Sequence, residues 1–97
     1  MRMMIRVTTP ADAGNAAIKS GRLEKLIGEA LARLKPEAAY FAADKGSRTM
    51  YFFVDVKDQS DMPSIAEPFF MELNASVEFQ PVMSPDDLRA GLAKLPK

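Results

Sequence analysis

Thr49-Met50-Tyr51-Phe52-Phe53-Val54-Asp55-Val56 is the stretch that decides the fold. Its even-numbered positions are all apolar, and two of its odd-numbered positions carry the rings of Tyr51 and Phe53. A strand with one face in water should alternate apolar and polar residues, so this strand is predicted to need cover on both faces. A chain of 97 residues has helix enough for one face of a sheet. We expect the second face to meet a partner subunit, a ligand or a nucleic acid.

Composition narrows the class of protein. The length predicts a single domain over residues 1–97. Thirteen basic and thirteen acidic side chains cancel, so no net field attracts nucleic acid. The chain has no histidine and no cysteine, which excludes disulfides, thiolate nucleophiles and sulfur-ligated metals. The apolar run near the N-terminus is too short for a signal peptide, and no run approaches the roughly 20 residues of a membrane span. These features predict a cytoplasmic protein without a membrane partner.

Hydrophobic periodicity predicts the order strand, helix, strand, strand, helix, strand, helix. The strands are expected at residues 3–8, 38–43, 49–56 and 77–82, and the helices at about 15–34, 60–73 and 85–95. The first helix has a weak point at Ser20-Gly21, where it either begins or breaks. Pro68 is expected to kink or split the second helix, and Pro81 places the last strand at a sheet edge. Ser84, Pro85 and Asp87 have the spacing of a capping box at the start of the terminal helix.

This order predicts a ferredoxin-like βαββαβ sandwich of the α+β class, with a four-stranded antiparallel sheet and an added C-terminal helix. The first and third strands are central, and the helices cover one side. We call the other side of the sheet the open face. Strand alternation assigns to it Met4, Arg6, Thr8, Tyr51, Phe53, Asp55, Glu78 and Gln80. Either Tyr40 or Phe41 joins them, because the second strand fits both phases. Such an apolar face is an association surface.

The element order, the doubly apolar third strand and the terminal helix resemble the dimeric α+β barrel superfamily. That superfamily includes small cofactor-free monooxygenases and muconolactone-isomerase-like proteins. The resemblance implies a homodimer that packs sheet against sheet, with Met4, Tyr51 and Phe53 in the interface and a small organic molecule bound in the barrel. It implies no cofactor. The histidines and tryptophans that several of these families use for catalysis have no counterpart here.

A cofactor-free enzyme, of monooxygenase or isomerase type, is one alternative. Arg6 would clamp an anionic substrate, Asp55 or Glu78 would act as the base, and Tyr40 or Tyr51 would donate a hydrogen bond. A structural ion pair around the arginine is the competing interpretation. The ligand-binding candidates are thus Arg6, Tyr40, Tyr51, Phe53, Asp55 and Glu78.

RNA binding, or another interaction module, is a further alternative. Tyr51 and Phe53 have the two-residue spacing of stacking aromatics in RNA-recognition strands, and Arg48 lies just upstream. Met50 and Phe52 occupy positions where small residues are expected, and the net charge is zero, so we expect no nucleic-acid partner. Asp55, Asp58 and Asp61 recur every third residue, but they lack the glycine and the bidentate glutamate of a calcium loop. We expect capping there and no metal.

Overall fold

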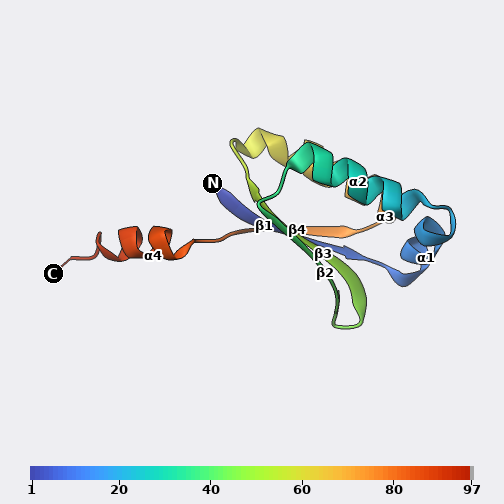
Figure 1. Cartoon of the computed structure of the whole chain (residues 1–97), viewed down its shortest axis with the longest axis horizontal. Coiled ribbons are helices and arrows are strands. Elements are labelled where there is room, and N and C mark those ends of the chain that lie inside the picture. Colours follow the sequence, from blue (N-terminus) through green and yellow to red (C-terminus); the bar gives the residue numbers. More distant parts are fainter. Residues whose placement is uncertain (97) are drawn as a thin grey trace.

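A computed structural model, which describes residues 1–96, gives an α+β fold with one antiparallel sheet (Figure 1). The strands are β1 (Arg2–Thr9), β2 (Ala38–Asp44), β3 (Ser47–Asp55) and β4 (Ser76–Pro81). The helices are α1 (Ala11–Lys19), α2 (Arg22–Leu34), α3 (Met62–Leu73) and α4 (Pro85–Leu92), and a short 3-10 helix, η1 (Gln59–Asp61), precedes α3.

The strand order in the sheet is β2-β3-β1-β4, and every neighbouring pair is antiparallel. The first and third strands are therefore central, as the sequence predicted, and β4 with its Pro81 lies at an edge. β2 and β3 form the expected hairpin, whose turn uses left-handed backbone at Lys45 (φ 53°) and Gly46 (φ 80°). The sheet of this chain is open at both edges and is not a closed barrel.

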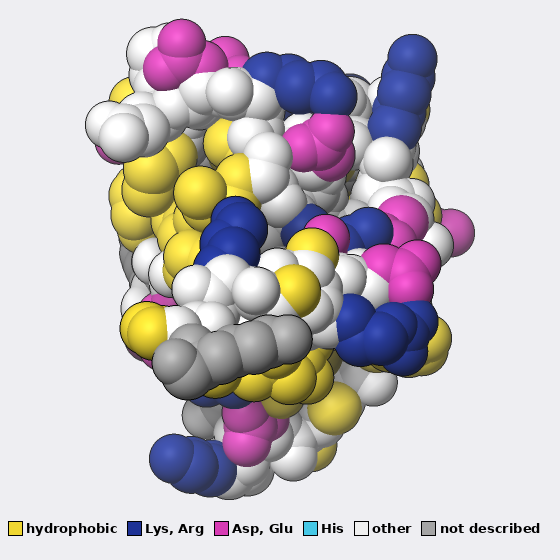
Figure 2. Space-filling model, turned by 90° about the vertical axis from the view of Figure 1, so that its left-hand side faces the viewer, with side chains coloured by type: hydrophobic (Ala, Val, Ile, Leu, Met, Phe, Trp, Pro, Cys, Tyr) yellow, Lys and Arg dark blue, Asp and Glu magenta, His cyan; other side chains and the backbone are white. Residues whose placement is uncertain are grey.

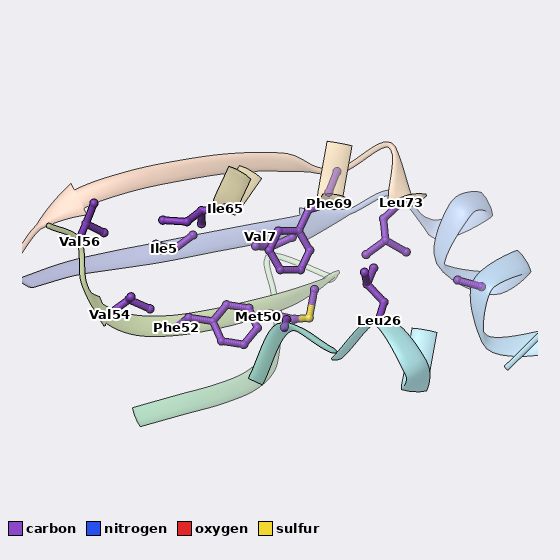
Figure 3. Close-up of a cluster of buried hydrophobic side chains, with 13 residues drawn as sticks. Ile5, Val7, Leu26, Met50, Phe52, Val54, Val56, Ile65, Phe69 and Leu73 are labelled. Atoms are coloured by element: carbon purple, nitrogen blue, oxygen red, sulfur yellow. The ribbon is translucent and has the colours of Figure 1, made fainter. Parts of the chain in front are cut away.

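The hydrophobic core lies between the sheet and the helices α1, α2 and α3 (Figures 1 and 3). Alternate residues of β1 and β3 point into it, and Phe52 stacks on Phe69 of α3 with ring centroids 5.9 Å apart. The largest fully buried side chains are Phe52, Phe69, Ile5, Leu26, Leu73 and Val7. One side of the doubly apolar strand is thus covered by the chain itself.

The helix boundaries differ from the predicted ones in two places, and the structure decides a third between its two predicted alternatives. α1 begins at Ala11, directly after Pro10, and not near Asn15. The predicted weak point is a complete break, because Gly21 adopts left-handed backbone (φ 78°) between α1 and α2. α3 continues through Pro68 in one piece from Met62 to Leu73, so the expected splitting does not occur.

α4 has the predicted capping box. The Ser84 hydroxyl accepts a hydrogen bond from the backbone N–H of Asp87 at 3.1 Å, and the Asp87 carboxylate accepts one from the Ser84 N–H at 3.0 Å. The helix projects from one end of the sheet and packs against no other helix or strand of the described chain (Figure 1). No helix within residues 1–96 is long and apolar enough to cross a membrane.

Candidate functional site

The open face is the surface that this chain leaves without cover. Register and strand alternation place Met4, Arg6, Tyr51 and Phe53 on it, and β4 adds Glu78 opposite Arg6. These are residues that the sequence assigned to this face. Figure 2 shows the end of the molecule from which α4 projects, where hydrophobic side chains are exposed among charges of both signs. The open face itself combines Met4, Tyr51 and Phe53 with Arg6 and Glu78, and such a mixed surface is suited to association and to ligand contact.

The structure decides which aromatic residue of β2 joins the open face. Tyr40 pairs with Tyr51, and its ring meets the Phe53 ring edge to face at 6.4 Å, so it lies on the open face and is 63% exposed. The Phe41 ring meets Phe52, a core residue, at 6.3 Å. Phe41 therefore belongs to the helix side.

Arg6 lies at the centre of the open face, in the row of paired residues Tyr40, Tyr51, Arg6 and Glu78. Its guanidinium carbon is 5.6 Å from the centre of the Tyr51 ring, within the range of a cation–π contact. Two carboxylates flank it: Nη1 is 3.8 Å from Glu78 Oε1, and Nε is 4.0 Å from Asp44 Oδ2. Both separations exceed hydrogen-bond length.

The Nε atom of Arg6 is buried and has no hydrogen-bond partner among the described residues. A buried donor without a partner costs free energy, and the cost is larger when the group is charged. Arg6 is thus held by attraction to two carboxylates, and a further acceptor would reach it through the exposed part of its side chain rather than through Nε.

Tyr51 is engaged on the same face. Its hydroxyl donates a hydrogen bond of 2.8 Å to Asp44 Oδ2, and this bond, with partial desolvation, raises the pKa of Tyr51 above its ordinary value. The phenol therefore keeps its proton. Asp44 is a member of the cluster that the sequence missed, because it was assigned to the hairpin turn. The sequence signal that could have placed it there is strand alternation: Asp44 follows Tyr40 and Ala42 on the same side of β2 if the strand extends one residue beyond its predicted end.

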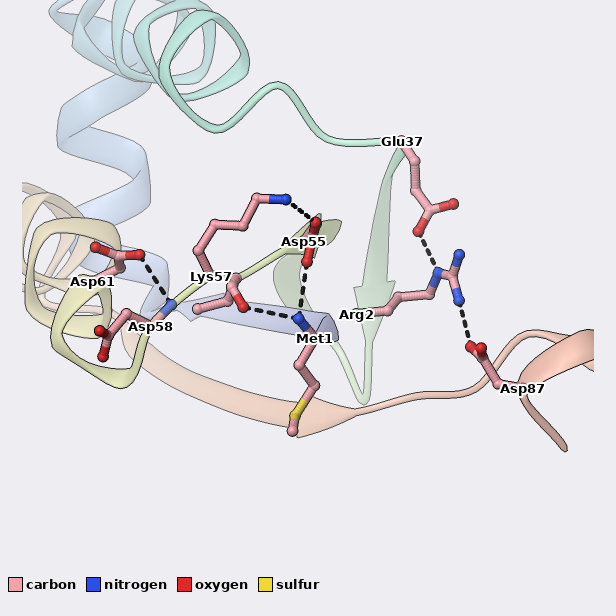
Figure 4. Close-up of polar contacts among 9 residues, drawn as sticks. Met1, Arg2, Glu37, Asp55, Lys57, Asp58, Asp61 and Asp87 are labelled. Carbon is pink, nitrogen blue, oxygen red and sulfur yellow. Dashed lines mark hydrogen bonds and ion pairs between the residues drawn. The ribbon is translucent and has the colours of Figure 1, made fainter. Parts of the chain in front are cut away.

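Asp55 lies apart from the Arg6 cluster. It pairs with Arg2 in the register, whereas Arg6 pairs with Tyr51. Its carboxylate contacts the Lys57 ammonium and, at 2.9 Å, the amino group of Met1 (Figure 4). Hydrogen bonding to Lys57 first, and then to the amino terminus, lowers the pKa of Asp55 to about 2.

A hollow of about 360 Å³ opens at the Arg2 end of the open face. Arg2 bridges two elements there, because its Nε lies 2.6 Å from Glu37 and its Nη1 lies 2.7 Å from Asp87 at the start of α4 (Figure 4). The walls include Tyr40, Phe53, Val82 and Met83. The root of α4 is therefore continuous with the open face.

Asp58 and Asp61 have local structural roles. They form the capping box of η1: the Ser60 N–H donates to the Asp58 side chain at 3.1 Å. The Asp58 N–H donates to the Asp61 carboxylate at 3.3 Å (Figure 4). Within residues 1–96, no group of three or more acidic side chains is arranged to hold a metal ion.

A scan against protein-family models, a search of curated proteins and a search of solved structures give no match for this chain. Inferences about its function therefore rest on its own residues and geometry.

Proposed function

We propose that the chain is a ferredoxin-like subunit that packs its open face on that of a second copy, giving a dimeric α+β barrel that binds a small organic anion at Arg6. The observation that carries this proposal is the Arg6 guanidinium at the centre of the open face, which has carboxylates at 3.8 and 4.0 Å but no hydrogen-bond partner for Nε among the described residues.

Surface area supports association. The chain exposes 6554 Å², whereas a compact monomer of 10.7 kDa would expose about 5500 Å². Exposed Tyr40 and half-buried Met4 and Phe53 contribute apolar area to the open face. The zero net charge removes the global repulsion that would oppose pairing of two identical chains.

The chemistry of Arg6 supports an anionic ligand. A guanidinium presents donors in a planar fork that matches a carboxylate in two-point contact. The Tyr51 ring contacts the guanidinium, and the rings of Tyr40 and Phe53 lie on the same face, which favours a flat, apolar body attached to that carboxylate. A small aromatic carboxylate combines both features and is the ligand class we propose.

Binding is preferred to acid–base catalysis because the groups suited to proton transfer are poorly placed. The Asp55 carboxylate contacts Lys57 and lies away from Arg6. The Tyr51 hydroxyl already donates a hydrogen bond to Asp44. Glu78 is the remaining candidate base from the sequence, and it lies beside the guanidinium at 3.8 Å.

The test begins with a native mass spectrum of the purified protein, which reports the number of subunits and any bound mass together. Benzoate is then titrated against wild type, Arg6→Met and the matched control Arg33→Met, with amide NMR shifts as the readout. Arg6→Met removes a charge-assisted contact, so its dissociation constant for benzoate should be about ten- to a hundredfold higher than that of the wild type, whereas Arg33→Met should bind benzoate as the wild type does. A monomeric wild type refutes the interface, and equal binding by Arg6→Met refutes the ligand site.

A further inference from the structure

α4 has an apolar face with nothing packed on it. Leu88 and Leu92 are four residues apart in α4 and therefore share one side of the helix, and Leu95 follows in the turn after the helix. All three are exposed, and α4 buries no residue. The Arg2–Asp87 ion pair and the capping box fix where the helix begins, but neither contact uses its leucines.

Such a helix needs packing from outside. Helices shorter than about 12–15 residues are marginal in water, and α4 has 8 residues. Its projection also enlarges the molecule: the radius of gyration is 15.5 Å, against about 12.5 Å for a compact domain of this length. Nothing within residues 1–96 covers these leucines, so they are available to pack against another molecule.

We infer that α4 is an arm exchanged between two copies of the chain, with its leucine face packed in the apolar cleft between α2 and β2 of the other copy. This inference rests on the homodimer proposed above and names a second contact within it.

The proposed acceptor is a cleft of about 360 Å³ on the helix side of the sheet. Leu23 and Ile27 of α2 form one wall, and Phe41 and Met50 form the other. Phe41 is 52% exposed although it faces the helix layer, because α2 leaves the edge strand partly uncovered. The cleft is therefore a ready apolar site for leucine side chains.

Position in the sheet argues that the occupant comes from a second copy. The cleft opens at the Thr9 end of the sheet, where Arg48 and Thr49 also line it, whereas α4 starts at the Arg2 end. The eight residues of β1 span seven steps, so these ends are about 24 Å apart. α4 extends about 12 Å as helix, and a fully extended chain from Leu92 to Leu95 adds about 10 Å, so the arm of one chain falls short of its own cleft.

A two-fold axis that stacks two open faces with reversed strand directions removes this separation. The Arg2 end of one sheet then lies over the Thr9 end of the other, and the contact is made twice by symmetry. Val82 and Met83, which lead into α4, line the end of the open face, so the arm would leave the sheet-to-sheet interface and pass the β2 edge of the other copy to reach the cleft on its helix side.

Cross-linking tests the exchange directly. The chain has no cysteine, so Leu92→Cys supplies a unique attachment point for benzophenone-maleimide. A mixture of unlabelled and ¹⁵N-labelled dimer is irradiated, and cross-linked peptides are identified by mass spectrometry. We expect adducts between copies within residues 23–50, and at least about tenfold fewer from the control Ala90→Cys, which lies on the opposite side of α4. Adducts within one chain, or to another region of the second copy, overturn the inference.

A pair of variants separates this inference from the homodimer itself. Leu88→Gln with Leu92→Gln changes side chains that are exposed in the subunit, so folding should be retained. The dimer dissociation constant should rise by about tenfold or more, while Ala90→Gln leaves it unchanged. A wild type that is monomeric refutes both proposals. A wild-type dimer that the double variant does not weaken refutes only the arm.

Discussion

Phe53→Glu separates the fold of the subunit from its association. Phe53 lies on the open face with its ring against Tyr40, and it is half-buried in the single chain. A glutamate there reaches water in the monomer, so the subunit should still fold. In a sheet-to-sheet dimer the same carboxylate is buried without a partner.

The magnitude follows from burying that charge twice. An unpaired ion costs several kcal/mol when it is removed from water, and a two-fold dimer buries two. A total of about 5 kcal/mol raises the dissociation constant by about three to four orders of magnitude. The variant should therefore be monomeric at concentrations where the wild type is a dimer.

Sedimentation velocity over a concentration series measures the association, and circular dichroism measures the fold. Phe70→Glu is the matched control, because Phe70 is exposed on α3 in the helix layer and the substitution is the same. We expect the control to remain dimeric. A Phe53→Glu dimer of unchanged affinity would refute the choice of the open face as the interface.

Two further predictions concern stability. The hydrogen bond from Lys57 is the main cause of the lowered pKa of Asp55. The ionised Asp55 therefore adds to the free energy of unfolding at pH values above its unfolded pKa of about 4, and this contribution is lost as the pH falls toward 2. Acid titrations of unfolding should show this loss in wild type, and Asp55→Asn should lack it; identical slopes would contradict the assignment. Gly28→Ala, in an open position of α2, should stabilise the chain by about 1 kcal/mol in chemical denaturation. Gly14→Ala should gain less, because its Cβ would lie 2.5 Å from Arg48 Nη1 and displace that side chain; an equal gain would show that Arg48 moves at no cost.

The sequence predicted local features that depend on neighbouring residues. The β2–β3 hairpin, the capping box of α4 and the break at Gly21 all occur where turn chemistry, spacing and backbone freedom placed them. The start of α1 was misplaced, because Pro10 can precede a first helical turn as well as end a strand. Pro68 was expected to kink or split α3, and it does not split it: the helix continues through Pro68, and neighbouring Phe69 is fully buried.

The sequence also located the candidate site on one face, but it did not give the membership of the Arg6 cluster. Alternation fixes which residues of one strand share a side. It does not fix which residue of the next strand lies opposite, since that depends on register. Asp55 was therefore assigned to the correct face but does not lie beside Arg6. Asp44 lies beside Tyr51 because β2 is one residue longer than predicted.

By itself, then, the sequence determined the order of elements, their turns and caps, and a central strand apolar on both sides. These follow from short-range sterics, hydrogen bonding and periodicity. Tertiary structure alone decided that Tyr40 and not Phe41 lies on the open face and that Arg6 lies between Asp44 and Glu78 at more than hydrogen-bond distance. It also decided that Leu88 and Leu92 of α4 find no cover among residues 1–96. Each of these depends on distances between segments far apart in the chain, which pairing and packing set and local sequence does not.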